Sequence, residues 1–286
     1  MKKKTRRLHQ ILKASGIARR DFIKKITLYA GSMSTAIAFT PSLEGKYLKS
    51  HSIEEEEKDL FTGYITYPGE NGEMRAYMAR PKKKKKYPAV IVIHENRGLN
   101  PHIENVNRRM AKEGFLSIAP DALSQVGGTP ANDEKKAIEM LRELKPEQNT
   151  KNFVAAVKYL ETHPLSNGKV GCTGFCWGGA MTNQVAVNSP GLDAAVPYYG
   201  RQPAPEDVAK IKAPLMAHYG GNDEGINKGI PEFEEALKKN NINYKIYIYE
   251  GAEHSFNNDS NPSRYHEQAA KLAWQRTVNF FKEYLK

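Results

Sequence analysis

Residues 170–179 read VGCTGFCWGG, and this stretch decides the fold class. The apolar run Val170–Phe175 predicts a buried strand, and the uncharged stretch Gly178–Asn188 after it predicts a helix. Cys176 stands on the tight corner between them, flanked by glycines that relieve clashes where strand, turn and helix meet. A corner of this kind holds a nucleophilic side chain in a strained backbone conformation above a sheet. The stretch therefore predicts an α/β fold with a thiol nucleophile at Cys176.

Strands and helices alternate on both sides of this corner. Continuous apolar runs, typical of parallel strands covered on both faces, predict strands at Ala89–Ile93, Phe115–Ala119, Val170–Phe175, Ala194–Tyr198, Leu215–Tyr219 and Tyr244–Tyr249. Helices are expected between them, at His102–Lys112, Asn132–Leu144, Lys151–Glu161, Gly178–Asn188, Pro231–Asn240 and Arg264–Tyr284. The β-rich runs Phe61–Pro68 and Met74–Pro81 predict an antiparallel hairpin. This order indicates a doubly wound, mostly parallel sheet with an N-terminal antiparallel hairpin.

The positive charge of the chain is concentrated at its N-terminus. The 286 residues include 43 Lys+Arg and 32 Asp+Glu, for a net charge of +11. Residues 1–38 hold ten basic residues and one acidic residue, so the other 248 residues carry only +2. A nucleic-acid binder would carry its basic residues on the folded body, so we expect no nucleic-acid partner. The two cysteines exclude a disulfide scaffold and a Cys-rich zinc module.

Residues 1–38 are typical of an export signal. A basic segment, residues 1–25, precedes an uncharged stretch that contains Ala36-Ile37-Ala38, a site of the kind that a signal peptidase cleaves. Within the basic segment, residues 18–24 (ARRDFIK) resemble a twin-arginine signal. We therefore expect an exported, periplasmic protein that meets the export machinery through this leader, with a linker at 39–58 and one folded domain at 59–286. The alternative is a basic amphipathic helix or tail on a cytoplasmic protein.

Two further residues supply the partners that a nucleophile needs. A thiol is activated by a base, and the base is oriented by an acid. Asp223 follows one expected strand within GGND, and His254 follows another within GAEHSF. Cys176, Asp223 and His254 thus occur in the chain order nucleophile, acid, histidine, each directly after a strand. The sequence predicts a Cys-His-Asp triad at one edge of the sheet, with the backbone N–H of Trp177 as an oxyanion donor.

The chain resembles the dienelactone hydrolase family of α/β-hydrolases from about Phe61 to its C-terminus. The resemblance is carried by residues 93–100 (IHENRGLN), 119–121 (APD), 174–179 (GFCWGG), 198–200 (YYG), 220–223 (GGND) and 254–256 (HSF). It implies that Glu95 helps to generate the thiolate, that the N–H of Asn96 is a second oxyanion donor, and that Tyr199 lines the pocket.

The implied activity is hydrolysis of a small-molecule carboxylic ester or lactone through a thioacyl enzyme, of the carboxymethylenebutenolidase type. No cofactor and no metal are expected, and the oligomeric state stays open.

One position departs from the family pattern. Family members that act on dienelactone bind the substrate carboxylate with arginines, one of them four residues after the catalytic histidine. This chain has Asn258 at that position, and the next arginine along the chain is Arg264. Arg97 and Arg201 are other candidates for binding a carboxylate. Asn258 therefore argues against dienelactone as the substrate and for a broader carboxylic-ester hydrolase.

Three alternatives stay open from the sequence. A thiol-dependent amidase or peptidase is one, because the same triad can cleave amides. A non-catalytic binding protein of the same fold is another, although no member of the triad is missing. The third is a metal site built from His94, Glu95, His218 and Asp223, but the sequence lacks the H-E-x-x-H and paired C-x-x-C motifs that would support it.

Overall fold

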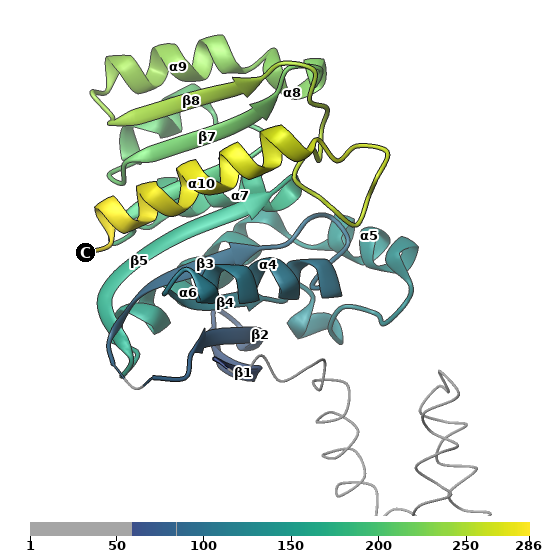
Figure 1. Cartoon of the computed structure of the whole chain (residues 1–286), viewed down its shortest axis with the longest axis vertical. Coiled ribbons are helices and arrows are strands. Elements are labelled where there is room, and N and C mark those ends of the chain that lie inside the picture. The colour runs from purple at the N-terminus through teal and green to yellow at the C-terminus, as the bar shows by residue number, and fades with distance from the viewer. Residues whose placement is uncertain (1–58, 84) are drawn as a thin grey trace, which may run out of the picture. The chain divides into compact units, whose positions relative to one another are not determined.

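A computed structural model describes residues 59–83 and 85–286 (Figure 1). The expected leader and linker, residues 1–38 and 39–58, lie outside the described residues. One sheet contains β1 (Leu60–Gly69), β2 (Gly72–Pro81), β3 (Tyr87–Ile93), β4 (Leu116–Pro120), β5 (Ser166–Phe175), β6 (Ala194–Tyr198), β7 (Leu215–Gly220) and β8 (Tyr244–Tyr249). The strand order is β1-β2-β4-β3-β5-β6-β7-β8. Strands β3 to β8 are parallel, and β1 and β2 form an antiparallel hairpin that joins β4, so the predicted fold class is confirmed.

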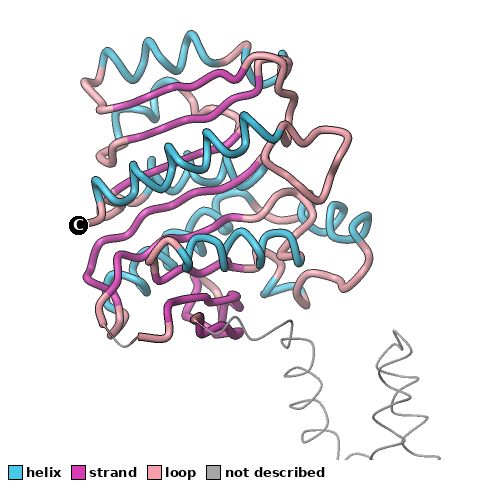
Figure 2. The backbone as a smooth tube through the Cα atoms, in the orientation of Figure 1, coloured by secondary structure: helices cyan, strands magenta, loops and turns pink. Residues whose placement is uncertain are grey.

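Helices cover both faces of the sheet (Figures 1 and 2). On one face lie α4 (Pro101–Lys112) and α10 (Glu267–Tyr284), and on the other α5 (Glu134–Glu143), α6 (Pro146–Thr162), α7 (Trp177–Asn188) and α9 (Ile230–Lys239). The shorter elements η1 (Ser124–Val126), η2 (Pro205–Lys210) and α8 (Glu224–Asn227) have too few residues for a hydrophobic period, and the sequence does not predict them. In the described part of the chain, no helix is both long enough and apolar enough to cross a membrane.

The buried strand β3 shows why continuous apolar runs predict this architecture. Ala89, Ile91 and Ile93 pack into the core on one face of the sheet. Val90 and Val92 pack into the core on the other face. All five side chains are fully buried, so neither face of the strand is left for polar residues.

Helix α6 begins at Pro146, five residues before the predicted start at Lys151. Its first turns are polar, so the hydrophobic period gives no sign of them. Asn152 is nevertheless buried, and its Oδ1 accepts a hydrogen bond of 2.9 Å from the backbone N–H of Glu70 in the β1–β2 turn. The polar start of the helix therefore holds the N-terminal hairpin against the sheet.

Strands β3 and β5 lie side by side, and their connections leave in opposite directions. The chain runs from β3 through α4 to β4 on one side of the pair, and from β5 through α7 to β6 on the other side. Such a switch point opens a crevice beyond the carboxyl ends of the two strands, where α/β sheets bind ligands. Both β3 and β5 deliver predicted site residues to this crevice.

Candidate active site

Cys176 lies at the corner between β5 and α7. Its φ of 56° and ψ of −114° place a non-glycine residue in a strained backbone region. The backbone N–H of Cys176 donates to the carbonyl of Tyr198 at 3.1 Å, and its own carbonyl accepts from Ala180 at 3.1 Å. A Cβ atom at Gly178 would overlap the carbonyl oxygens of Ile93 and His94, so only glycine lets the helix start this close to β3. The predicted strand–turn–helix corner is present.

His254 and Asp223 reach Cys176 from two other loops. Asp223 follows β7 at the start of α8, and His254 follows β8. The Oδ2 of Asp223 lies 2.6 Å from the Nδ1 of His254, and the imidazole also interacts with the Cys176 side chain. Asp223 is 9% exposed and the side chain of His254 is 25% exposed. The structure thus brings together three side chains that the sequence places after three different strands.

The contacts of His254 favour its protonated form. Burial by itself lowers the pKa of the imidazole, but the hydrogen bond to Asp223 and the interactions with the Cys176 side chain and the charges of both groups outweigh burial. They raise the pKa of His254 to about 10. A positive imidazolium in turn stabilises a thiolate, and the N-terminus of α7 adds a favourable dipole at the same place. The arrangement of the two side chains is one that can support a thiolate–imidazolium pair.

Cys172, the second cysteine, belongs to the core. It is fully buried on β5, and its Sγ lies 3.8 Å from the Oγ1 of Thr182. Burial raises the pKa of the Cys172 thiol to about 12. Only Cys176 therefore has the exposure and the polar neighbours that nucleophilic chemistry requires.

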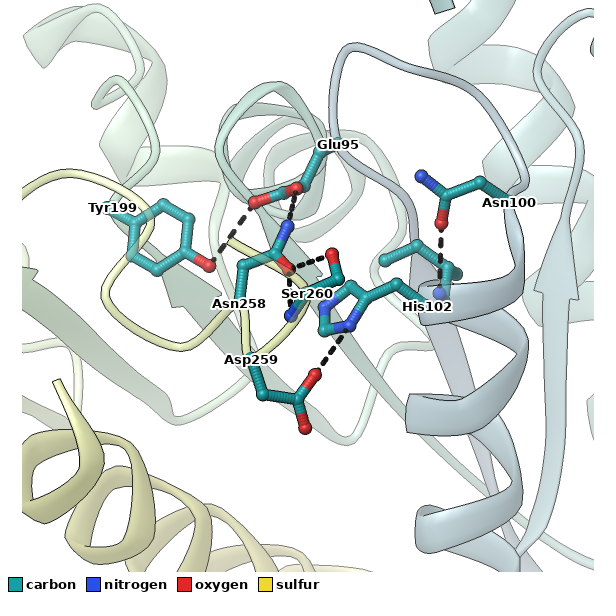
Figure 3. A network of polar contacts seen from close by, with 8 residues as sticks. Glu95, Asn100, His102, Tyr199, Asn258, Asp259 and Ser260 are labelled. Atoms are coloured by element: carbon teal, nitrogen blue, oxygen red, sulfur yellow. Dashed lines mark hydrogen bonds and ion pairs between the residues drawn. The ribbon is translucent and has the colours of Figure 1, made fainter. Parts of the chain in front are cut away.

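Glu95, the acid that follows β3, is 4% exposed and has only neutral hydrogen-bond partners (Figure 3). The Nδ2 of Asn258 donates to its Oε2 at 2.6 Å, and the hydroxyl of Tyr199 donates to its Oε1 at 3.4 Å. The Oδ1 of Asn258 accepts from the backbone N–H of Ser260 at 3.0 Å, so the amide is oriented with its nitrogen toward Glu95. Among residues 59–83 and 85–286, no lysine or arginine forms an ion pair with this carboxylate.

Tyr199 lies between Glu95 and His254. Its φ of 36° is unusual for a tyrosine, and its backbone N–H donates to the carbonyl of His218 at 2.7 Å. The ring meets the imidazole of His254 edge-on, with 5.1 Å between ring centroids. Burial and then the charge of Glu95 raise the pKa of Tyr199 well above its ordinary value, so the hydroxyl keeps its proton. Tyr199, the residue expected to line the pocket, therefore contacts both Glu95 and His254.

The backbone N–H groups of Asn96 and Trp177 lie on two segments in direct contact. Asn96 follows Glu95 after β3, and Trp177 is the first residue of α7, where the N–H has no acceptor within the helix. Gly178 packs its backbone against the carbonyls of Ile93 and His94, which joins the two segments. In the part of the chain that is described, neither N–H forms a hydrogen bond outside a helix or strand, so both are free to bind an oxygen.

The loop that carries Asn258 is anchored on the N-terminus of α4. The Oδ1 of Asp259 lies 3.0 Å from the Nδ1 of His102 (Figure 3). Asn100 caps α4 by accepting a hydrogen bond of 3.1 Å from the N–H of Ile103. The sequence does not predict this anchor, because no local pattern joins residues so far apart in the chain. It places Asn258 against Glu95, so the residue that departs from the family pattern is a direct partner of the predicted acid.

Comparison with known proteins identifies relatives of this chain. A sequence model of the dienelactone hydrolase family matches residues 74–285. The chain belongs to the dienelactone hydrolase family. A protein of Escherichia coli (strain K12) named "putative carboxymethylenebutenolidase" is 33% identical over 83% of this chain and 92% of its own length. A protein of the same name from Saccharolobus solfataricus is also 33% identical, over 79% of this chain and 98% of its own.

A solved structure from the same family also matches the fold of this chain. The crystal structure of a "putative dienelactone hydrolase" from Klebsiella pneumoniae matches with a TM-score of 0.71 and 30% identity. The match covers 79% of this chain and 99% of that one. The family and the α/β-hydrolase fold predicted from the sequence are confirmed, and the protein is a hydrolase of the dienelactone hydrolase family.

The arginines considered for carboxylate binding are either paired with an acidic side chain or exposed to solvent in this protein. The guanidinium of Arg97 pairs with Glu134 of α5 at 3.0 Å. Arg201 and Arg264 are exposed. None of the three contacts Glu95, so Asn258 is not replaced by a nearby arginine from another segment.

Nothing in the described residues resembles a metal centre. No three side chains among His, Cys, Asp and Glu gather there in an arrangement that would hold a metal ion. His218 is buried between β7 and α10, where it bonds Tyr249 at 2.9 Å and Thr277 at 3.1 Å. His94 contacts the loop after β4 instead, so the residues of the metal alternative do not converge.

Proposed function

We propose that this protein hydrolyses carboxylic esters or lactones through Cys176, His254 and Asp223, with a thioacyl-enzyme intermediate. One observation carries the proposal: the imidazole of His254, which interacts with the thiol on the strained corner, has its Nδ1 2.6 Å from the carboxylate of Asp223. That is the relationship of nucleophile, base and orienting acid. The names of the relatives support the same class, because a butenolide is a lactone.

Acylation begins with the thiolate of Cys176. Its Sγ attacks the carbonyl carbon of the substrate, and the electron pair of the C=O bond moves to the oxygen. The N–H groups of Trp177 and Asn96 bind this oxyanion. When the tetrahedral intermediate collapses, the C–O bond to the alcohol breaks and His254 gives its proton to the departing alkoxide. A thioester on Cys176 and a neutral imidazole remain.

Deacylation returns the enzyme to its starting state. Neutral His254 takes a proton from water while the water oxygen attacks the thioester carbonyl. The C–S bond breaks, the carboxylic acid leaves, and the thiolate–imidazolium pair is restored. Asp223 keeps the imidazole oriented and stabilises its charge in both half-reactions. As the family resemblance implies, we expect Glu95 to help generate the thiolate.

The charge around Glu95 favours substrates without a carboxylate of their own. The carboxyl group of Glu95 has only the neutral side-chain partners Asn258 and Tyr199 and no cationic partner among the described residues. A substrate carboxylate entering beside it would meet repulsion in a site shielded from water, where such charges act strongly. Neutral esters are therefore the substrate class that we infer.

The test is hydrolysis of p-nitrophenyl acetate and butyrate by the purified full chain. Cys176→Ala and His254→Ala are expected to lower kcat by about a thousandfold or more, and Asp223→Asn by about a hundredfold or more. Cys172→Ala is the matched control and should keep its activity. Mass spectrometry after an acid quench should find an acetyl group on Cys176 in the wild type.

Three outcomes would contradict the proposal in different ways. Equal rates in wild type and Cys176→Ala, with circular dichroism unchanged, would remove Cys176 from the reaction. Cleavage of p-nitroanilides without cleavage of the esters would make the protein an amidase. No Cys176-dependent turnover of either class would leave the non-catalytic binding protein.

A further inference from the structure

His94, the last residue before Glu95, is fully buried and uses both ring nitrogens. Its Nε2 lies 3.1 Å from the backbone N–H of Ala122, which can only donate, so Nε2 accepts. Its Nδ1 lies 2.6 Å from the backbone carbonyl oxygen of Glu95, which can only accept, so Nδ1 carries the proton. Burial lowers the pKa of His94 against the opposing charges of Asp121 and Glu95, which agrees with a neutral ring. The two contacts therefore select one tautomer and one orientation of the ring.

The hydrogen bond to the Glu95 carbonyl also determines where the next N–H points. The C=O of Glu95 and the N–H of Asn96 belong to one planar trans peptide, in which they point in opposite directions. An imidazole that holds the carbonyl on one side therefore directs the Asn96 N–H toward the other side. That N–H is one of the two oxyanion donors in the proposed reaction.

The same ring touches the segment that carries the other donor. The imidazole of His94 and the indole of Trp177 are stacked, with 5.3 Å between ring centroids and planes 10° apart. Phe153 of α6 meets the indole at 6.2 Å and 64°, which limits its movement. The carbonyl of His94 also packs against Gly178 in the first turn of α7. One side chain thus contacts both halves of the candidate oxyanion hole.

A set of hydrogen bonds fixes the far end of the loop that follows β3. The carboxylate of Asp121 accepts from the N–H of Thr129 at 2.8 Å and from its hydroxyl at 2.7 Å. The same hydroxyl oxygen accepts from the N–H of Leu99 at 2.9 Å. The loop after β3 is therefore fixed at both ends, by His94 at its start and by Thr129 at Leu99.

We propose that His94 is a positioning residue that sets the direction and the spacing of the two oxyanion donors, Asn96 N–H and Trp177 N–H. It acts on the first through the carbonyl of Glu95 and on the second through the stacked ring. Donors held in place before the reaction stabilise the developing oxyanion without reorganisation, and the loss of one such donor costs about a hundredfold in kcat or more. The inference rests on the proposed function, because an oxyanion hole acts only in acyl transfer.

Two variants separate the two contacts of His94. His94→Phe keeps a flat ring against Trp177 but removes the donor to Glu95. His94→Asn loses the stack but brings an amide nitrogen close to the position of Nδ1. His163→Phe, at a half-buried histidine after the end of α6, is the matched control.

Two rates are measured on the full chain in a Cys172→Ala background: hydrolysis of p-nitrophenyl butyrate, and alkylation of Cys176 by iodoacetamide. Alkylation depends on the thiolate and forms no oxyanion. In His94→Phe we expect kcat to fall by about 10- to 100-fold, with KM and the alkylation rate changed by less than about threefold. His94→Asn should recover part of the lost kcat, and His163→Phe should match the background protein.

Parallel losses of hydrolysis and alkylation in His94→Phe would overturn the inference, since His94 would then act on the thiolate or on the fold. Unchanged kcat would overturn it as well. If His94→Phe does not fold by circular dichroism, the same two rates in His94→Asn and His94→Gln decide, with hydrolysis reduced more than alkylation as the expected result. Absence of Cys176-dependent hydrolysis in the wild type would contradict the proposed function itself, which is a separate outcome.

Discussion

Asn258 donates a hydrogen bond of 2.6 Å from its Nδ2 to the Oε2 of Glu95, which lies 163 residues earlier in the chain. Ser260 holds the other end of the amide, so Asn258 cannot turn its oxygen toward the carboxylate without losing two hydrogen bonds. The buried carboxyl group of Glu95 is therefore held by a neutral group. No lysine or arginine in the described chain pairs with it, so we expect the charge of the residue at position 258 to affect which substrates are accepted.

Replacement of the amide by a cation should change substrate preference. The wild type is expected to hydrolyse p-nitrophenyl butyrate better than mono-p-nitrophenyl glutarate, which carries a free carboxylate at similar length. In Asn258→Arg, the guanidinium can pair with Glu95 and attract a substrate carboxylate. The ratio of kcat/KM for glutarate over butyrate should rise by about tenfold, the value of one moderately screened charge interaction.

Asn258→Leu is the control for this prediction, because it removes the amide without adding charge. It should lower kcat/KM for both esters and leave their ratio near the wild-type value. An equal ratio in Asn258→Arg and Asn258→Leu would mean that the charge beside Glu95 does not select the substrate.

Tyr199→Phe should have a milder effect than Asn258→Leu. The tyrosine hydroxyl donates to Glu95 at 3.4 Å, whereas the amide of Asn258 donates at 2.6 Å, and the longer contact is the weaker one. We expect kcat for p-nitrophenyl butyrate to fall by less than about tenfold in Tyr199→Phe, in line with the loss of one weak hydrogen bond. A larger loss than in Asn258→Leu would show that the hydroxyl of Tyr199 contacts the substrate itself.

Local patterns were sufficient for the fold and for the positions of three candidate site residues at the ends of strands. The apolar run Ala89–Ile93 predicts β3 because both of its faces are buried, and the glycines around Cys176 predict the corner because the backbone segments touch there. Asp223 and His254 follow buried strands, and parallel strands end at the same edge of a sheet. Each of these features depends on residues that are neighbours in the chain or on strand order.

The contacts that complete the site depend on pairs far apart in sequence. Asn258 reaches Glu95, and Asp259 reaches His102, only because α4 and the loop before α10 meet on one face of the sheet. His94 shows the other difficulty: next to an acid it fits a metal ligand, whereas the structure gives both ring nitrogens backbone partners. Composition and periodicity carry no signal for such contacts.

Gly178→Ala should destabilise the protein, whereas Gly225→Ala should not. A Cβ at Gly178 would overlap the backbone carbonyls of Ile93 and His94, and backbone atoms cannot move aside as a flexible side chain can. The cost of such overpacking is about 1–3 kcal/mol in the free energy of unfolding. At Gly225 a Cβ meets no atom within 4 Å. Urea denaturation of both variants measures the difference, and equal stabilities would contradict the close approach of α7 to β3.

His254 should contribute to stability in a pH-dependent way. Its pKa is raised from the ordinary 6.5 to about 10 in the folded protein, so the folded state binds the proton more tightly than the unfolded state. The contribution is complete below about pH 6.5 and is lost as the pH rises toward 10. The difference in the free energy of unfolding between wild type and His254→Gln should therefore be largest near the low end of this window. Between the two pKa values, the difference should shrink by about 1.4 kcal/mol for each pH unit.

Cys176→Ala keeps the hydrogen bond between His254 and Asp223 but loses the contribution of the thiol. It should show the same direction of pH dependence relative to His254→Gln, with a smaller amplitude. A difference that stays constant across the whole window would mean that Asp223 and Cys176 do not hold the imidazolium in the folded protein.

Iodoacetamide should label one cysteine in the native protein, although the chain contains two. Cys172 is fully buried, and burial raises the pKa of its thiol to about 12, so it presents neither access nor thiolate at neutral pH. Cys176 is half-buried at the start of α7, beside an imidazolium. Mass spectrometry should find one adduct on the native wild type, none on native Cys176→Ala, and two on the wild type in guanidinium. Two adducts on the native protein would contradict the burial of Cys172 and remove the separation between a structural thiol and a reactive one.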